Sequence, residues 1–182
     1  HVAVRVRTVS RPDKRNALSR ATLEALHAAF DAAAADEAVR TVVLTGSGGK
    51  AFVAGADIAE MSALSAVQAG DFSLVGQRLM RRIETLPKPV IAMVNGFALG
   101  GGLELALACR YRIVVDEPGT KLALPEVMLG IVPGWGGMLR LPELIGPAAA
   151  LDLMLTGKSV DAKKAKRIGL ADDCVPARVM ES

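Results

Sequence analysis

The sequence predicts a mixed α/β fold with largely parallel strands. Of the 182 residues 51% are hydrophobic but only 3% are aromatic, so the apolar side chains are mainly Ala, Val and Leu, which pack helices closely against strands. Strand and helix patterns alternate through the first two thirds of the chain, as crossover connections between parallel strands require. The length fits a single domain, residues 1–182, with a core of its own.

The first half of the chain alternates between predicted strands and helices. Valines at every second position indicate a half-buried first strand. Ser19 is a favourable N-cap for the helix that follows a loop of turn-forming residues. Pro87 and Pro89 end a second helix, and the all-apolar segment PVIAMV is typical of a strand covered on both faces. In order, the predicted elements are the strand Val2–Val9, the loop Arg11–Ser19, the helix Ser19–Ala35, the strand Val39–Gly46, a glycine-rich loop, a helix from about Ser65 to Leu86 and the strand Pro89–Val94.

The second half of the chain is richer in helices. A glycine-rich turn precedes a helix of almost entirely apolar residues, and a strand and an extended segment follow it. The predicted elements are a helix from about Gly102 to Cys109, the strand Tyr111–Asp116, the extended segment Thr120–Pro125, helices in Gly136–Gly146, Pro147–Gly157 and Asp161–Gly169, and a short strand in Asp172–Pro176. No fixed-period repeat is present, which argues against a solenoid.

The net charge and the cysteine content limit the classes of ligand and the cellular compartments that fit the sequence. The formal net charge of +3 comes from scattered basic residues, which gives little support to nucleic-acid binding and favours a small anionic ligand. Cys109 and Cys174 fit no metal-binding or CxxC spacing, so we expect free thiols in a reducing compartment, the cytoplasm. The apolar stretch Pro89–Cys109 contains Asn95, Glu104 and the triple glycine Gly100–Gly102, so we expect no membrane span there. We also expect no secretory leader.

Two strand-to-helix junctions leave backbone N–H groups without a partner inside a helix. One passes through Gly55 and Ala56 to the cap residue Asp57, and the other passes through Gly100–Gly102. If the N–H groups of Ala56 and Gly101 point at one spot, they can hold the oxygen of a carbonyl that becomes an enolate, as an oxyanion hole does. Tight packing alone also explains glycines at a helix start, but the presence of two such junctions favours the oxyanion hole.

Two glutamates lie in apolar surroundings. Glu104 falls in the first turn of a helix, where an exposed carboxylate would simply complement the helix dipole, but apolar neighbours on most faces indicate burial. Glu126 follows Pro125, which is also a common arrangement at an ordinary helix start. A buried carboxyl group has a raised pKa and can transfer protons near neutral pH. Two such acids beside two amide sites predict proton transfer next to a stabilised enolate.

Five segments carry further motifs: RPDKRNALS, AFVAGADIAEM, PKPVIAMVNGFALGGGLELALACRYRI, LPEVMLGIVPGWGGMLRLPELIG and LTGKSVDAKKAKRIGL. In this order they resemble the enoyl-CoA hydratase/isomerase (crotonase) family, from Val2 almost to the end of the chain. The resemblance implies a crotonase-like spiral of ββα units that binds a coenzyme A thioester, with the thioester carbonyl held by the N–H groups of Ala56 and Gly101. It implies no metal and no cofactor, because coenzyme A is part of the substrate.

By the same resemblance, the chain hydrates a 2-enoyl-CoA in fatty acid β-oxidation. Glu104 is expected to activate the water that adds to Cβ, Glu126 to deliver the proton to Cα, and the two to titrate as a coupled pair. Gly134 is expected to hold the water through its N–H. The residues expected to line or contact coenzyme A are Asp13, Lys14, Arg15, Lys50, Ala54, Gly55 and Asp57.

The second half of the chain resembles the N-terminal portion of multifunctional β-oxidation enzymes, which leaves isomerisation of 3-enoyl-CoA as an alternative activity. Met138 and Leu139 stand where polar residues are common in the family. The family continues past Ser182 with helices that complete the site, so we expect the C-terminal helical region to be incomplete. The expected partners are the acyl-CoA and either further copies of the chain, as a trimer or dimer of trimers, or the rest of a larger chain. Neither a nucleic acid nor a membrane is expected.

Two other classes of function remain to be weighed. The segment GSGGKA, Gly46–Ala51, satisfies a dinucleotide-binding pattern, but that pattern needs a helix directly afterwards, whereas the sequence brings another glycine turn. Lys50 is followed by Ala rather than by the Ser or Thr of a P-loop. A non-catalytic relative that binds coenzyme A or RNA is the second alternative, and the presence of both Glu104 and Glu126 argues against it.

Overall fold

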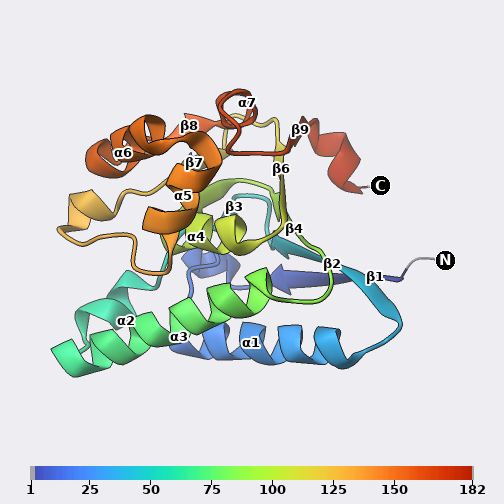
Figure 1. The fold of residues 1–182 in the computed structure, drawn as a ribbon, viewed down its shortest axis with the longest axis horizontal. Coiled ribbons are helices and arrows are strands. Elements are labelled where there is room, and N and C mark those ends of the chain that lie inside the picture. The colour runs from blue at the N-terminus through green and yellow to red at the C-terminus, as the bar shows by residue number, and fades with distance from the viewer. Residues whose placement is uncertain (1–2, 182) are drawn as a thin grey trace.

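Two β-sheets organise the chain, of which the computed structural model describes residues 3–181 (Figure 1). The larger sheet has five parallel strands in the order β1-β2-β4-β6-β9, and the smaller has the order β3-β5-β7-β8, in which β7 and β8 are antiparallel. The strands are β1 (Ala3–Val9), β2 (Val39–Gly46), β3 (Ala51–Val53), β4 (Val90–Val94), β5 (Phe97–Leu99), β6 (Tyr111–Val115), β7 (Lys121–Ala123), β8 (Val160–Asp161) and β9 (Asp173–Val175).

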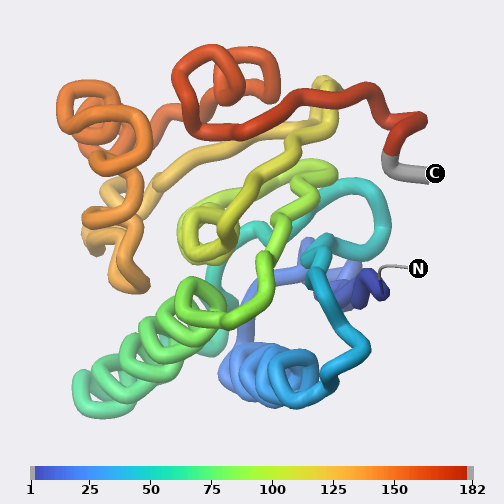
Figure 2. Tube along the Cα trace, turned by 45° about the vertical axis from the view of Figure 1, so that its right-hand side comes forward, coloured from blue at the N-terminus to red at the C-terminus, as the bar shows by residue number. Residues whose placement is uncertain are grey.

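From β2 to β7, consecutive strands enter the two sheets alternately. The pairs β2–β3, β4–β5 and β6–β7 each place one strand in the larger sheet and one in the smaller, and helices follow each pair. The chain therefore rises in successive turns, which Figure 2 shows as a climb from the N-terminal half at the bottom to the C-terminal residues at the top. This arrangement is the predicted spiral of ββα units, and the α/β fold class is confirmed.

Helices cover the sheets and fill the space between turns. They are α1 (Arg20–Ala35), α2 (Ile58–Ser62), α3 (Ala66–Glu84), α4 (Gly101–Ala108), α5 (Gly137–Ile145), α6 (Pro147–Thr156) and α7 (Ala162–Arg167), with 3-10 helices η1 (Pro12–Lys14), η2 (Glu126–Leu129) and η3 (Ala177–Glu181). Ser19 caps α1, as predicted, by accepting the Thr22 N–H. Helices α1 and α3 contact each other, and both run below β1 and β2 in Figure 1.

Helix α4 lies at the centre of the fold. All eight of its residues are buried, and it contacts α3, α5 and the strands β3, β5 and β6. A short helix that is apolar on every face can be stable only when other elements surround it. Its first turn carries Glu104, which is 2% exposed. The burial that the sequence indicated for Glu104 is therefore observed.

The structure differs from the predicted elements mainly where strands are very short. The strands β3, β5 and β8 were not predicted, because two or three residues cannot display a period-two pattern. Val2, where the first predicted strand begins, lies outside the described residues. The segment GSGGKA runs from β2 through a turn into β3 and not into a helix, so it lacks the context that dinucleotide binding requires.

Two further expectations concern the whole chain. Cys109 and Cys174 are both free thiols, as expected. Within residues 3–181, no helix has the length and apolar character that would let it cross a membrane.

Candidate active site

A cavity of about 700 Å³ lies at the ends of the strands of the smaller sheet. The β3–α2 and β5–α4 junctions form one part of its wall, and α2, α3, η2 and the loop after η2 form the rest. Apolar side chains dominate the lining, among them Met61, Leu64 and Phe72. The carboxyl groups of Glu104 and Glu126 interrupt this apolar wall. A cavity with few polar groups fits a ligand that has an apolar chain and one reactive polar group.

Parallel pairing brings the two strand-to-helix junctions together. Strands β3 and β5 pair with Val53 opposite Ala98, so Ala56 and Gly101, each three residues further on, leave the sheet from neighbouring positions. A Cβ added to Gly55 would lie 3.4 Å from the Leu99 carbonyl oxygen. Ala56 and Gly101 both line the cavity.

The Ala56 N–H is left without a partner by the way its segment pairs. Leu18 N–H donates to the Gly55 carbonyl at 2.8 Å, and Asp57 N–H donates to the Leu18 carbonyl at 2.9 Å. In such a parallel bridge the N–H of the central residue, Ala56, points away from Leu18. Gly101 begins α4, where N–H groups have no acceptor inside the helix. Neither the Ala56 nor the Gly101 N–H finds an acceptor among residues 3–181.

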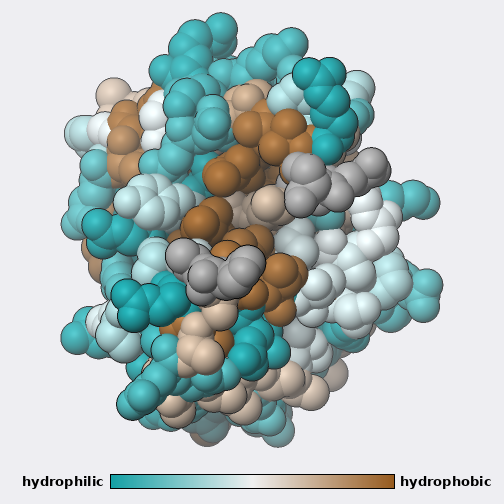
Figure 3. Space-filling model, turned by 90° about the vertical axis from the view of Figure 1, so that its right-hand side faces the viewer, coloured by the Kyte–Doolittle hydropathy of each residue, from teal (hydrophilic) through white to brown (hydrophobic). Residues whose placement is uncertain are grey.

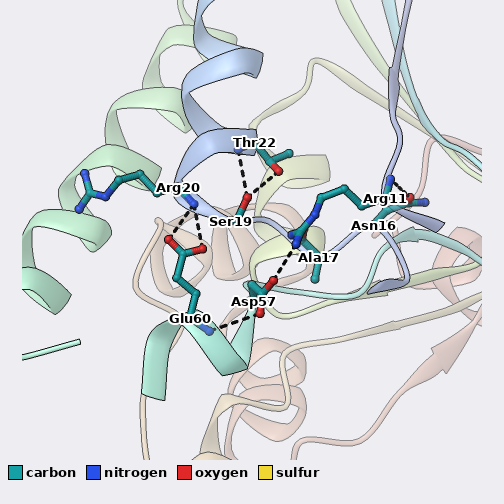
Figure 4. A network of polar contacts seen from close by, with 8 residues as sticks. All are labelled: Arg11, Asn16, Ala17, Ser19, Arg20, Thr22, Asp57 and Glu60. Carbon is teal, nitrogen blue, oxygen red and sulfur yellow. Dashed lines mark hydrogen bonds and ion pairs between the residues drawn. The ribbon is translucent and has the colours of Figure 1, made fainter. Parts of the chain in front are cut away.

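A polar network behind the first junction fixes its position (Figure 4). Arg11 forms an ion pair with Asp57 at 2.9 Å and donates to the Ala17 carbonyl at 2.6 Å. Asp57 also caps α2 by accepting the Glu60 N–H, and Glu60 accepts the Arg20 N–H at the start of α1. The hydrogen bond from Arg11 lowers the pKa of Asp57 below its usual value. The Asp57 carboxylate is therefore committed to Arg11 and α2, and Asp57 is not part of the cavity lining.

Asn16 is a structural residue that the sequence analysis treated only as part of a turn. It is fully buried with a φ of +60°. Its amide donates to the carbonyl groups of Ser47 and Ala51 at 2.9 and 2.8 Å and accepts the Arg11 N–H at 2.9 Å. Asn tolerates the left-handed conformation better than most residues. The one available sequence signal was an Asn inside a predicted loop.

Glu104 reaches the cavity from the first turn of α4. Its Oε1 atom accepts the N–H groups of Trp135 and Gly137, both at 2.8 Å. Burial raises the pKa of Glu104, and these two hydrogen bonds together with the charge of Arg140 act in the opposite direction. A carboxyl group held in this way can remain ionised and act as a base in an apolar site.

Glu126 is the first residue of η2 and is 7% exposed. Its Oε2 atom is buried and has no hydrogen-bond partner in the described part of the chain. Its Oε1 atom lies over Gly100, since a Cβ there would be 2.8 Å from it. Burial, and to a smaller extent the charge of Glu104, raises the pKa of Glu126 to about 7. Glu126 can therefore hold a proton near neutral pH and release it to a ligand.

Trp135 is a lining residue that the sequence analysis did not single out. Its ring packs against Phe72 at a centroid distance of 5.6 Å. Added Cβ atoms on Gly76 and Gly101 would lie 2.2 and 2.4 Å from ring atoms, so glycine at both positions makes room for the indole. Gly134, the predicted water-holding residue, also lines the cavity, and its carbonyl accepts Gln77 Nε2 at 2.8 Å.

The residues predicted to contact coenzyme A are only partly at the cavity. Ala54 and Gly55 line it. The exposed segment Asp13–Arg15 adjoins it, because Ala54 N–H donates to the Arg15 carbonyl at 3.1 Å. Lys50 is exposed and precedes β3, at the opposite end of this strand from Ala54. The side chains of Asp13, Lys14, Arg15 and Lys50 do not line the cavity.

Comparisons with known proteins point to one family. A family model described as enoyl-CoA hydratase/isomerase matches residues 2–182. A crotonyl-CoA hydratase from Syntrophomonas wolfei is 50% identical over 92% of this chain, which spans 64% of that relative. The fatty acid oxidation complex subunit alpha of Vibrio cholerae is 52% identical over 71% of this chain, a match that covers 18% of that protein. The crystal structure of an enoyl-CoA hydratase from Bacillus anthracis matches 98% of this chain and 68% of its own, with a TM-score of 0.94 and 41% identity.

Proposed function

The chain belongs to the enoyl-CoA hydratase/isomerase family, and we propose that it adds water to a 2-enoyl-CoA thioester in fatty acid β-oxidation, which gives the 3-hydroxyacyl-CoA. The observation that carries the proposal is the meeting, at one cavity, of two backbone N–H groups that have no acceptor among residues 3–181 and two buried carboxyl groups. The names of the Syntrophomonas and Bacillus relatives support the same reaction.

In the proposed reaction, the two N–H groups and the two carboxyl groups each have a distinct role. The thioester oxygen accepts the N–H groups of Ala56 and Gly101. Ionised Glu104 takes a proton from a water, which Gly134 helps to hold, and the hydroxide oxygen bonds to Cβ. The electrons of the double bond move through Cα to the thioester oxygen, where the two N–H groups stabilise the enolate. Protonated Glu126 then delivers its proton to Cα.

The raised pKa of Glu126 supports this division of roles. A carboxyl group with a pKa of about 7 is protonated often enough at neutral pH to act as an acid. Burial raises the pKa of Glu104 as well, but its two hydrogen bonds on one oxygen oppose that shift and favour the ionised form. Isomerisation of 3-enoyl-CoA is the alternative, since an acid beside an enolate can also move a proton between Cα and Cγ.

The proposal also covers the contacts with coenzyme A, the absence of other cofactors, the cellular location and the assembly of the protein. Lys14 and Arg15 are exposed cations on the segment that adjoins the cavity at Ala54 and can meet the phosphates of coenzyme A. Lys50 is also exposed but lies at the far end of β3, so its contact with these phosphates remains a proposal from the family resemblance. We propose no metal or cofactor beyond the coenzyme A of the substrate, and a cytoplasmic location. We also propose, from the family resemblance, that copies associate into a trimer or dimer of trimers; exposed apolar residues of η2 and the loop after it, which also line the cavity, are available for such contacts. The Vibrio relative supports the alternative of a larger multifunctional chain.

The decisive experiment measures loss of the conjugated thioester absorbance with crotonyl-CoA. We expect Glu104→Gln and Glu126→Gln each to lower the rate by about 10²–10⁴, the usual contribution of acid–base catalysis. Glu117→Gln, an exposed glutamate outside the cavity, is the matched control and should keep the full rate. Rates within tenfold of the parent for both variants would refute the assigned roles.

A further inference from the structure

The turn Trp135–Gly137 is held from two sides. On one side its Trp135 and Gly137 N–H groups bind Glu104 Oε1. On the other, Arg140 Nη1 of α5 donates to the Trp135 carbonyl oxygen at 3.1 Å. Gly136 has a φ of +107°, and a Cβ there would lie 2.1 Å from Arg140 Nη1. The guanidinium group therefore occupies the space directly beside Gly136. Glu104 can accept both N–H groups only while the turn keeps this conformation.

Arg140 is itself anchored to α3. Its Nε and Nη2 atoms donate to the two carboxylate oxygens of Glu84 at 3.1 and 3.0 Å. This two-point contact fixes the plane of the guanidinium group. The side chains of Arg140 and Glu84 are 17% and 48% exposed, so solvent reaches the Glu84 side of this ion pair and weakens it in part. Helix α3 is thereby connected through Arg140 to the turn that binds Glu104.

We propose that Arg140 is a positioning residue for Glu104: anchored on Glu84, it holds the Trp135–Gly137 turn in the conformation that donates two N–H groups to the carboxylate. The inference deepens the proposed function and rests on it only for the role of Glu104 as the base.

The charge of Arg140 and the hydrogen bonds of the turn both favour the ionised form of Glu104. Burial raises the pKa of Glu104, while the two N–H donors and the positive charge of Arg140 counteract it. Within residues 3–181, Glu126 of η2 lines the same cavity, and the charge of Glu104 raises the pKa of that group; Glu84 is bound to the far side of Arg140. A substitution that removes the Arg140 guanidinium group removes a positive charge. It also leaves the turn that carries the Trp135 and Gly137 N–H groups less firmly held. Both changes make Glu104 easier to protonate.

The test follows the protonation of Glu104 directly, by ¹³C NMR of protein labelled at the glutamate carboxyl carbon. A Glu126→Gln background leaves one carboxyl group to titrate in the cavity, and loss of the signal in Glu104→Gln assigns it. We expect Arg140→Met to move the midpoint upward by about one pH unit. Arg140→Lys keeps the charge but not the two-point contact and should move the midpoint by less.

Arg82→Met is the matched control. Arg82 lies on α3 and pairs with Asp31 at 2.6 Å, but it joins α3 to α1 and not to the turn. Its removal should leave the Glu104 midpoint unchanged. If Arg140→Met and Arg82→Met gave the same midpoint, the inference would be overturned, whatever happened to stability. Should Arg140→Met not fold, Arg140→Lys carries the same comparison.

Activity provides a second readout in the enzyme that retains Glu126. Arg140→Met should lower kcat about tenfold or more with a smaller change in KM, and the acidic limb of the kcat/KM profile should move to higher pH. The NMR titration needs no substrate. Absence of hydration in the parent would therefore reject the proposed function, while the titration would still decide the role of Arg140.

Discussion

Gly102 lies directly against the backbone of Val53: a Cβ on Gly102 would be 2.0 Å from the Val53 carbonyl oxygen. The first turn of α4 is thus pressed onto the end of β3, and this contact sets the distance between the two strand-to-helix junctions. The glycine is required here by close approach, because its φ is not in the left-handed region.

Gly102→Ala is expected to destabilise the protein by about 1–3 kcal/mol, because the β3 backbone must move to admit a methyl group. Gly70→Ala is the matched comparison, since Gly70 is exposed inside α3 and a Cβ there meets nothing within 4 Å. That variant should be more stable by about 0.5–1 kcal/mol. Urea unfolding of both proteins measures the difference. Equal effects of the same sign would contradict the packing described here.

The Glu126 carboxyl group makes stability depend on pH. Its pKa is about 7 in the folded protein against 4.5 in the absence of burial, so the folded state binds this proton more tightly than the unfolded state. Stability is therefore lost as pH rises from about 4.5 to about 7. Glu126→Gln cannot ionise, so relative to the parent it should gain up to roughly 3 kcal/mol across this range. Urea unfolding at several pH values measures it.

Glu117→Gln is the control for the loss of a glutamate carboxyl group, because Glu117 is exposed. As a surface change it should alter the free energy of unfolding by less than about 0.5 kcal/mol. A difference between Glu126→Gln and the parent that stayed constant from pH 4.5 to pH 7 would show that Glu126 is not held in an unfavourable environment.

Trp135 makes ligand binding visible. It is the single tryptophan of the sequence, it is 6% exposed, and it lines the cavity. Crotonyl-CoA added to the slow Glu104→Gln variant should change the tryptophan emission in a saturable manner. Trp135→Phe in the same background removes the signal while it keeps an aromatic ring. If calorimetry recorded binding and the emission stayed constant, the ligand would occupy another place.

Asn16→Ala is expected to cost roughly 2–4 kcal/mol of stability. The change leaves the Ser47 and Ala51 carbonyl groups and the Arg11 N–H without their partner, and it places alanine at a φ of +60°. Denaturant unfolding tests this. A cost under about 0.5 kcal/mol, as for an ordinary surface change, would mean that the loops do not depend on this side chain.

Much of the fold was predictable from local pattern. The strands β1, β2, β4 and β6 show apolar periodicity or continuous apolar runs, and Ser19 and Asp57 are helix caps that a single residue type can indicate. The smaller sheet was not predictable in this way, although β7 falls within the predicted extended segment Thr120–Pro125. Its strands have two or three residues, and their hydrogen bonds come from neighbours that only the stacking of spiral turns supplies.

The residues of the site also fall into those that the sequence could predict and those that it could not. Glu104 and Glu126 are conspicuous in sequence because charged residues are rare in apolar runs, and glycine marks the junction at Gly101. The donors to Glu104 could not be found from the sequence, because Trp135 and Gly137 bind through backbone groups that every residue type carries. The role of Arg140 could not be predicted either, because an arginine on a helix is usually exposed to solvent and has no structural role.

Glu104 receives its donors from residues 31 and 33 positions later in the chain. During synthesis the segment that becomes α4 therefore leaves the ribosome well before the turn that satisfies its acid. A buried carboxylate without donors is strongly unfavourable, so the nascent chain is expected to keep this segment hydrated until Gly137 has emerged. A ribosome-bound chain stalled before that point should expose the α4 region to protease, and one stalled well beyond it should protect the region.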